Sequence, residues 1–434
     1  MKQPQIRLAA GAAVFALVAV ACGTASGGEL EAGGSPPATN LSDSNPSTTA
    51  QAPTEEAATE SDPSSLGATT GPQAAVGTLP EGPSALETYG APEFPPALID
   101  PDEIISGGPP PDGIPSIDDP TFLPVIDHLD LLPAQEPVVV LEIEGDARAY
   151  PARILIWHEI VNDMVGGVPV AVTYCPLCNS AATYVRQIDG VTTTFGTSGR
   201  LFASALVMYD RATETLWTHF DGKAVVGLLA GKELESIPSP LMSWGDFRST
   251  YPDGLVLDEA ATGYSRDYGR NPYVGYDDAE TFPFLFAGSV DERARAKQRV
   301  IGITLEGESV AYALEFISGD AAAPRATAIE LGGSPLVVFW SPGQSSALED
   351  DSLSGGRDVG TVGVFESTVD GSVLSFLGTT DGFTDQETGS SWNLGGEAVA
   401  GPLAGASLDR VRHLDTFWFA WATYSPGTEL VEVP

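Results

Sequence analysis

Short runs of β-branched and aromatic residues recur along the chain, and they predict strands. Val168–Tyr174 and Leu336–Trp340 are two such runs, bounded by Gly-Gly and by proline, which is typical of strands. Asp189-Gly190 and Asp370-Gly371 lie between runs of this kind. We expect hairpin turns at both places, because glycine tolerates positive φ.

Helical periodicity is weaker than the strand pattern. Its clearest instance, ahead of a Gly-Gly break, consists of Ile154, Trp157, Ile160 and Val161. This spacing predicts a short helix, on which Glu159 and Asp163 would share one face. We therefore expect a mainly β fold with short helices, and α+β is the alternative.

The second half of the chain repeats the order of motifs in the first. Leu141–Gly145 corresponds to Ile303–Gly307, and Trp217 corresponds to Trp392. The other matched pairs are Ala149-Tyr150 with Ala311-Tyr312, Gly166–Val170 with Gly332–Leu336, Asp189-Gly190 with Asp370-Gly371, Phe195 with Phe376, Gly227–Gly231 with Gly401–Gly405, Trp244 with Trp418 and Pro252 with Pro426. The preserved order predicts a tandem duplication, with repeat 1 at 137–295 and repeat 2 at 296–434. Residues 86–136 are expected to pack on this body.

The N-terminus has the pattern of a lipoprotein signal peptide over residues 1–21. Lys2 and Arg7 precede an apolar stretch, Leu8–Ala21, that is too short to span a bilayer. Small residues then lead to Cys22, which is the position where a lipoprotein signal peptidase leaves an acylated cysteine. We expect an exported protein held at the outer face of the cell membrane by this lipid; plain secretion is the alternative.

Residues 22–85 are rich in Gly, Ser, Thr, Pro, Ala and Glu and are expected to form a disordered tether. No Lys or Arg occurs between Arg7 and Arg148, and the net charge of the chain is -39. Nucleic acid is excluded as a partner, because phosphate binding requires clustered Lys and Arg. Besides the membrane, a protein partner or small ligand stays unidentified.

Apart from Cys22, the only cysteines form the motif Cys175-Pro176-Leu177-Cys178. Proline favours a turn here, which would bring the two sulfurs together. The pair could form a structural disulfide, although closing so short a loop stabilises by only about 2 kcal/mol. It could also exchange between dithiol and disulfide.

The third possibility is a metal site for Cu(I) or Zn, in which His158 joins Cys175 and Cys178 as a ligand. His219 is a second candidate histidine. Residues that could support these ligands or contact a bound molecule are Glu159, Asp163, Tyr209, Asp210 and Arg211. A scaffold or ligand-binding module with a fixed disulfide is the non-catalytic alternative, and a Ser-His-Asp hydrolase is disfavoured because no Gly-x-Ser-x-Gly elbow occurs.

The predicted second repeat lacks this chemistry. Ser341 and Gln344 stand where repeat 1 has Cys175 and Cys178, and no histidine corresponds to His158. If the fold required a sulfur bridge at this turn, both repeats should carry it. The contrast favours a functional site over a structural disulfide.

Several motifs together closely resemble the DUF3179 family of exported prokaryotic proteins, over about residues 106–423. They are Ser106–Pro115, Ala149–Pro151, His158–Asp163, Thr173–Cys178, Leu206–Arg211 and Phe417–Trp421. The resemblance implies no assigned reaction. Pro111 and His219 depart from it, because relatives usually carry a basic residue and often a glutamine at these positions, whereas His158, Cys175 and Cys178 fit the pattern.

Overall fold

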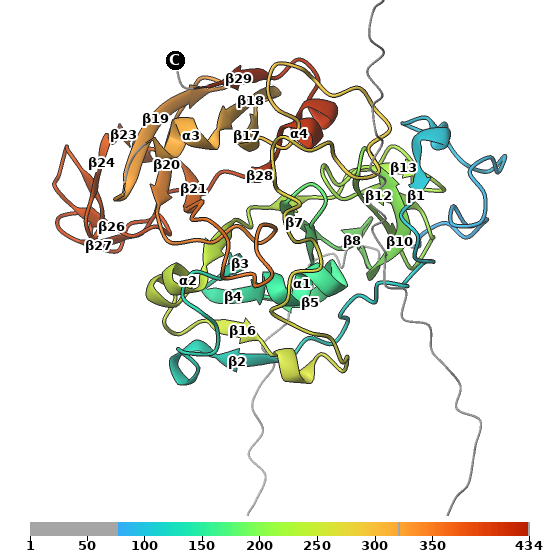
Figure 1. Cartoon of the computed structure of the whole chain (residues 1–434), viewed down its shortest axis with the longest axis horizontal. Coiled ribbons are helices and arrows are strands. Elements are labelled where there is room, and N and C mark those ends of the chain that lie inside the picture. Colours follow the sequence, from blue (N-terminus) through green and yellow to red (C-terminus); the bar gives the residue numbers. More distant parts are fainter. Residues whose placement is uncertain (1–76, 320–321, 433–434) are drawn as a thin grey trace, which may run out of the picture. The chain divides into compact units, whose positions relative to one another are not determined.

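The computed structural model describes residues 77–319 and 322–432. In this part of the chain strands contain far more residues than helices, and most neighbouring strands are antiparallel (Figure 1). The predicted mainly β fold is confirmed. The described residues all belong to one compact unit, Pro72–Pro434. The predicted signal peptide, Cys22 and most of the tether lie outside the described residues.

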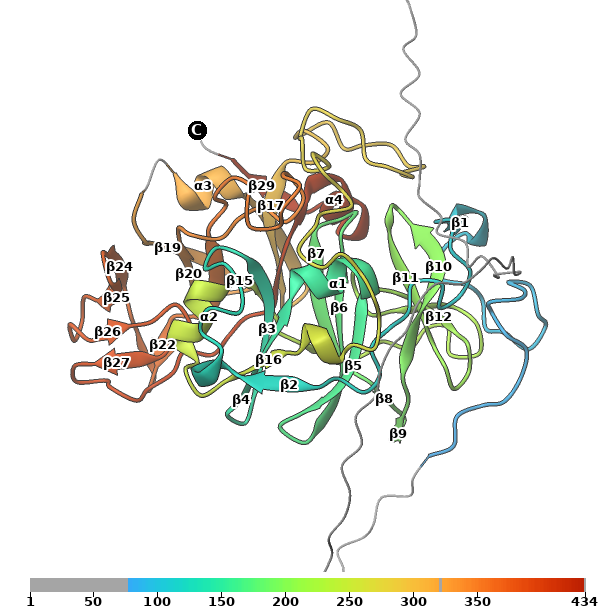
Figure 2. The same ribbon diagram turned by 60° about the horizontal axis from the view of Figure 1, so that its bottom comes forward.

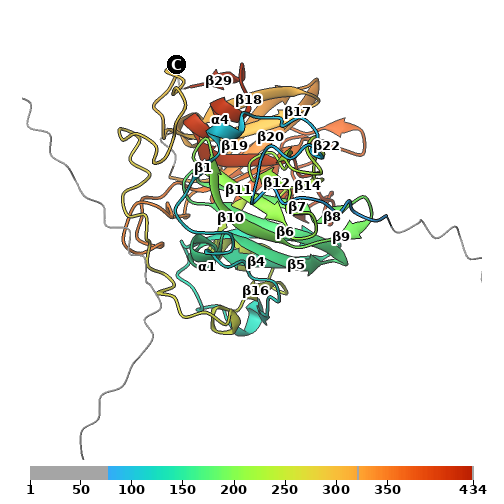
Figure 3. The same ribbon diagram turned by 90° about the vertical axis from the view of Figure 1, so that its right-hand side faces the viewer.

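Three larger sheets contain the strands of the first half. The first sheet has the order β15 (Leu241–Ser243), β3 (Pro137–Ile143), β4 (Asp146–Pro151), β16 (Leu255–Leu257) and β2 (Phe122–Pro124). The second has the order β14 (Ser236–Ile237), β7 (Ser180–Val185), β6 (Val168–Cys175) and β5 (Ile160–Val165). The third, seen in Figure 3, has the order β1 (Ile105–Ser106), β10 (Phe195–Phe202), β11 (Ala205–Asp210), β12 (Leu216–Thr218) and β13 (Ala224–Val226).

The second half repeats these strand pairings. Its first sheet has the order β28 (His413–Phe417), β17 (Arg299–Leu305), β18 (Glu308–Ala313) and β29 (Glu429–Val431). The second has the order β19 (Arg325–Leu331), β20 (Ser334–Ser341) and β21 (Thr361–Glu366). The third has the order β24 (Phe376–Thr379), β25 (Gly382–Asp385), β26 (Ser391–Trp392) and β27 (Ala398–Ala400). In both halves the first sheet contains a parallel pair, β4 with β16 and β18 with β29. The shared pairings support the predicted duplication, which stays an inference from sequence.

Side-chain networks recur between the halves as well. Asp210 accepts a hydrogen bond of 2.9 Å from the indole N–H of Trp217, and Asp385 accepts one of 2.9 Å from that of Trp392. Each carboxylate also accepts from a threonine hydroxyl three residues later. Asp210, Trp217, Asp385 and Trp392 are all buried, so each aspartate ties a hairpin together.

Both predicted hairpin turns are confirmed. Asp189 and Gly190 have φ values of 49° and 81°, and Asp370 and Gly371 have values of 49° and 78°. Positive φ at both central residues matches the right-handed twist of the flanking strands. The turns join β8 (Gln187–Ile188) to β9 (Val191–Thr192), and β22 (Thr368–Val369) to β23 (Ser372–Val373).

The predicted extent of the first helix is wrong. Helix α1 is Ala152–His158, and Ile160 and Val161 belong to β5 instead (Figure 2). The chain leaves the helix at Glu159, whose carbonyl oxygen accepts a hydrogen bond of 2.9 Å from the Tyr174 N–H of β6. Sheet pairing thus overrides the helical spacing, and Glu159 and Asp163 do not share a helix face. The other helices are α2 (Trp244–Thr250), α3 (Leu314–Ser318) and α4 (Trp418–Tyr424).

The segment before the first sheet packs on the body. Gly107 N–H donates to the carbonyl of Gly199, and Ile117 N–H donates to that of Ile160. The contacts begin within the stretch expected to be tether, because Ala85 is fully buried and its N–H donates to the Glu214 carbonyl. Three short 3-10 helices accompany these connections: Pro101–Glu103, Val125–Asp127 and Glu259–Ala261.

The matched Asp–Trp networks predict matched losses of stability. Asp210→Ala and Asp385→Ala should each lower the free energy of unfolding by about 2 to 4 kcal/mol, because each leaves a buried indole N–H without its acceptor. Urea denaturation measures both, with Asp253→Ala, at an exposed position, as the control. A large loss at Asp210 alone would contradict equal structural roles.

Candidate functional site

The two thiols of the motif lie at a tight turn between β6 and β7. Cys175 ends β6 and pairs with Ser180, the first residue of β7. Pro176 accepts a hydrogen bond of 3.2 Å from the N–H of Asn179, whose φ is 48°. Cys175 and Cys178 are both free, with exposed fractions of 1% and 0%. The turn therefore brings the two sulfurs together as thiols, inside the body.

The two thiols have unequal surroundings. Burial by itself raises the pKa of Cys175, but hydrogen bonds from the Cys178 side chain and from backbone N–H groups outweigh burial and lower this pKa. One of these N–H groups, that of Leu206, lies 3.4 Å from Cys175 Sγ. Burial and the neighbouring Cys175 raise the pKa of Cys178 well above its usual value. Cys175 is consequently the more nucleophilic partner.

Glu159 is the acidic group coupled to this pair. Burial and, to a smaller extent, the charge of Cys175 raise the pKa of Glu159 to about 8. Burial together with Glu159 and Cys175 also raises the pKa of Tyr273. The site thus contains a carboxyl group that is protonated at neutral pH next to a thiol that ionises readily.

The backbone of Glu159 is strained, which indicates a functional role for its side chain. It follows α1 with φ 58°, in the left-handed region that favours glycine. The residue that follows α3 in the second half is Gly319, with φ 54°. A glutamate where the matching position has glycine costs stability, which is characteristic of functional sites.

The second half holds the turn from the other side. The Cys178 carbonyl accepts hydrogen bonds of 2.7 Å from the Thr416 hydroxyl and 3.2 Å from the Phe417 N–H, both on β28. The amide group of Asn179 donates to Asp415, which forms a buried ion pair with Arg299. The position of the thiols therefore depends on both halves of the body.

An irregular stretch, residues 262–298, lies between the last 3-10 helix and β17 and covers the turn; we term it the covering segment. The Tyr276 hydroxyl donates to the Leu177 carbonyl at 3.0 Å and accepts from the Phe284 N–H at 3.3 Å. Ser204 donates to the Phe284 carbonyl at 2.5 Å. These bonds attach the segment to Leu177, between the two cysteines, and to the turn between β10 and β11.

His158, predicted as a metal ligand, is engaged elsewhere. Its Nδ1 donates to the Pro115 carbonyl at 2.8 Å, so Nε2 accepts from the Tyr268 hydroxyl at 2.6 Å. Burial lowers the pKa of His158 and keeps it neutral. Within residues 77–319 and 322–432, no group of three or more His, Cys, Asp or Glu side chains is arranged to hold a metal ion. The structure does not bring His158 together with the two cysteines as a ligand set.

The other predicted site residues occupy separate places. Asp163 accepts from Arg148 at 2.8 Å and from Tyr150 at 2.6 Å. Tyr209 and Arg211 both bond to Asp112, which precedes the first sheet. These groups anchor backbone segments, and the partners named here are groups other than the two thiols.

Sequence reasoning missed Ser180 as a member of the site. Its hydroxyl lies 3.0 Å from Cys178 Sγ and 2.8 Å from His219 Nε2. His219, which the sequence offered as a metal ligand, is thus joined to the pair through a serine. A short polar residue after the second cysteine was the only available signal.

The comparisons with known proteins identify a family without a known function. The family described as "Protein of unknown function (DUF3179)" matches residues 111–428, well over half of the chain. The chain belongs to this family. No curated protein and no solved structure matches it.

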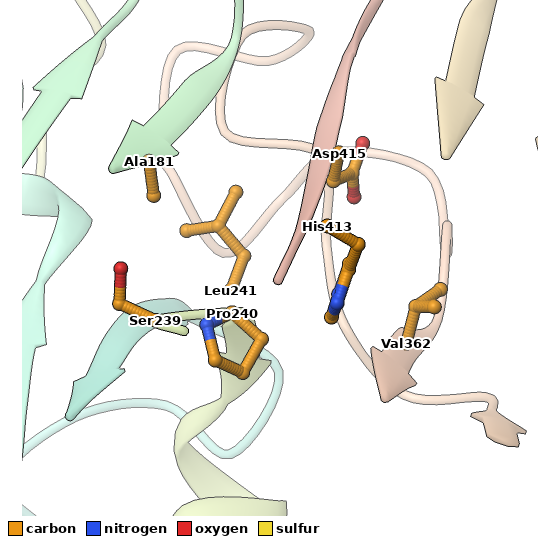
Figure 4. A pocket seen from close by; sticks show the side chains of 7 residues that line it. All are labelled: Ala181, Ser239, Pro240, Leu241, Val362, His413 and Asp415. Carbon is orange, nitrogen blue, oxygen red and sulfur yellow. The ribbon is translucent and has the colours of Figure 1, made fainter. Parts of the chain in front are cut away.

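In this DUF3179 chain a small cavity lies behind the turn, where β28 approaches β7. Figure 4 shows its lining residues: Ala181, Ser239, Pro240, Leu241, Val362, His413 and Asp415. Its volume is about 10 Å³, room for about one water molecule. Burial lowers the pKa of His413 to about 4, so this histidine stays neutral beside the cavity. The cavity is too small for a substrate.

No helix in the described stretches of this DUF3179 chain is long and apolar enough to cross a membrane. The predicted lipid attachment at Cys22 lies outside these stretches.

The pKa of Glu159 predicts a pH-dependent gain in stability for Glu159→Gln. The unfolded glutamate ionises from about pH 4.5, whereas the folded one stays protonated until about pH 8. Stability is therefore lost as the pH rises through this range, by up to about 5 kcal/mol. The glutamine variant should match the unaltered protein at pH 4.5 and exceed it in unfolding free energy at pH 8.

Urea denaturation under reducing conditions at both pH values measures this difference. Glu144→Gln is the matched control, because Glu144 is exposed and also has positive φ, 52°. Equal stabilities of the Glu159→Gln variant and the unaltered protein at pH 8 would show that Glu159 ionises normally.

Proposed function

We propose that Cys175 and Cys178 form a reversible dithiol–disulfide pair, in which Cys175 reacts first and Cys178 completes the exchange. The observation that carries this proposal is the inequality of the two thiols beside a protonated Glu159. Unequal thiol pKa values are what a Cys-x-x-Cys exchange site requires.

The donor set favours exchange over metal binding. Two thiolates supply too few ligands for zinc, and both nitrogens of His158 are already hydrogen-bonded. His219 reaches the pair only through Ser180, to whose hydroxyl its Nε2 is bonded. A purely structural bridge is disfavoured because each sulfur has its own hydrogen-bond partner as a free thiol.

Exchange with a small disulfide, RSSR, needs no atoms, protons or electrons beyond those of RSSR, Cys175, Cys178 and Glu159. The Cys175 thiolate attacks one sulfur, forms a mixed disulfide and expels RS⁻, which takes the proton of Glu159. Cys178 then attacks Cys175 Sγ and gives its proton to the second departing RS⁻. The pair loses two electrons, RSSR becomes two RSH, and one negative charge moves from Cys175 to Glu159.

We further propose that this chemistry takes place outside the cell membrane, with the body attached to the membrane by a lipid at Cys22. The leader at residues 1–21 supports this placement. Compartments outside the membrane favour disulfide exchange, because thiols there are not kept reduced.

Redox titration tests the proposal. The purified protein, equilibrated with mixtures of reduced and oxidised glutathione, should convert between a dithiol and an intramolecular Cys175–Cys178 disulfide with a single midpoint. Trapping by alkylation followed by mass measurement counts the free thiols. Cys178→Ser should accumulate the mixed disulfide with glutathione at Cys175, whereas Cys175→Ser should react far more slowly.

Two outcomes would overturn the proposal. One is a pair that stays reduced under fully oxidising glutathione. The other is a stoichiometric metal, found by elemental measurement of the purified protein, that is lost in both cysteine variants.

Access to Cys175 requires displacement of the covering segment. Tyr276→Phe removes the hydrogen bonds of the hydroxyl to the Leu177 carbonyl and from the Phe284 N–H, so local opening should become more frequent. Alkylation of Cys175 by iodoacetamide should then be at least about 5 to 10 times faster, which is the effect of losing one such hydrogen bond. Tyr264→Phe, in the same segment but 43% exposed, should react at the unaltered rate. Equal rates for all three proteins would mean that the thiols are reached by another route.

A further inference from the structure

A chain of four buried side chains extends from Cys178 into the first half. Cys178 Sγ lies 3.0 Å from the Ser180 hydroxyl, which lies 2.8 Å from His219 Nε2. His219 Nδ1 lies 2.7 Å from the Thr173 hydroxyl, which donates to the Ala182 carbonyl at 2.7 Å. All four side chains are at most 1% exposed, so water does not compete for these bonds.

The far end of the chain fixes the direction of every bond. A carbonyl oxygen can only accept, so the single hydrogen of the Thr173 hydroxyl points at Ala182. His219 Nδ1 must then carry the hydrogen that it shares with Thr173, and Nε2 must accept. The Ser180 hydroxyl therefore donates to His219, and toward Cys178 it is an acceptor.

This direction determines which proton state of Cys178 is favoured. A serine that donated to the sulfur would stabilise the thiolate, but the hydrogen of Ser180 is committed to His219 Nε2. The other neighbour of Cys178, the Cys175 sulfur, also accepts from it. The Ser180 hydroxyl, the Cys175 sulfur and the Cys175 carbonyl, which lies 3.8 Å from Cys178 Sγ, thus favour the hydrogen on Cys178, whereas the backbone N–H of Ser180 favours its loss.

The second half shows that the fold does not require this polar chain. Phe339 and Gly363 pair across β20 and β21 as Thr173 and Ala182 pair across β6 and β7. Leu394 follows Trp392 by two residues, as His219 follows Trp217. Phe339 and Leu394 belong to one buried apolar cluster, so apolar side chains fill the positions that match Thr173 and His219.

We propose that His219 is a positioning residue that, through Thr173 and Ser180, fixes Cys178 as the protonated member of the pair. This inference rests on the proposed exchange, for which it explains why Cys175 and not Cys178 reacts first. A neutral imidazole suffices for the role, and burial lowers the pKa of His219 to about 3.

Other titratable groups around the chain do not supply this asymmetry. Arg412 lies near His219 and disfavours a second positive charge there. Tyr424 and Tyr276 are close enough to both thiols for the thiol charges to raise their pKa values. Glu159 is coupled to Cys175. The serine hydroxyl differs from these groups because it is hydrogen-bonded to Cys178 itself.

The experiment measures the tautomer of His219 and the ionisation of Cys178 separately. Nitrogen-15 chemical shifts of the imidazole should show hydrogen on Nδ1 in the reduced protein. In a Cys175→Ser background, carbon-13 labelling of cysteine Cβ reports the ionisation midpoint of Cys178 as the pH is raised. Neither measurement needs redox activity, so failure of the proposed exchange is distinguishable from failure of this inference.

Thr173→Val is the decisive variant, because valine has nearly the same shape and removes only the acceptor of the Nδ1 hydrogen. His219 should then carry its hydrogen on Nε2 and donate to Ser180, which frees the serine to donate to Cys178. The midpoint of Cys178 should fall by about one pH unit. His219→Gln is the matched control, because its amide oxygen can accept from Ser180 while its amide nitrogen donates to Thr173.

Hydrogen on Nε2 in the unaltered protein would overturn the inference. So would a Cys178 midpoint that is unchanged in folded Thr173→Val. If Thr173→Val does not fold, Ser180→Ala in the same background decides, because removal of an oxygen that accepts from the thiol should lower the midpoint. A rise in that midpoint would mean that the serine donates to the thiolate, and would contradict the inferred direction.

Discussion

The carbonyl oxygen of Cys178 is the point on which the arrangement of the site depends. It accepts from two donors on β28, and Asp415 on the same strand is held by the guanidinium of Arg299. A buried ion pair is costly unless its geometry is good, and breaking one by removing a partner is strongly destabilising. The first half contributes the thiols, and the second contributes the surface that fixes their turn.

The two halves use one set of strand pairings for different purposes. The network of Asp210 with Trp217 recurs as Asp385 with Trp392, and it has no chemistry beyond holding a hairpin. By contrast, the second half has the apolar side chains of Phe339 and Leu394 where the first half has Thr173 and His219. The strand pairings and the Asp–Trp networks recur in both halves. The buried polar side chains that lead to Cys178 differ between them.

Sequence reasoning succeeded where the signal was local. Alternating β-branched runs gave the strands, and Asp-Gly pairs gave the hairpins, because turn geometry depends on the residues of the turn. It failed where partners distant in sequence decide. The sequence around His158 does not indicate that Tyr268 and Pro115 form hydrogen bonds with its two nitrogens. The sequence around Ile160 does not indicate that this residue pairs with β6 as part of a strand. The cysteine pair was found from the motif, whereas the link from Ser180 to His219 required the fold.

Because the backbone of Glu159 is left-handed, selection for stability alone would favour replacement of this residue. Glycine would relax that conformation and remove the cost of burying a carboxyl group, so a search for thermostable variants should find replacements there readily. Those same variants would lose the acid beside Cys175. A library sorted only for folded, long-lived protein would therefore enrich chains with an intact body and an inert thiol pair, and thermostability would be a misleading guide to a working member of the family.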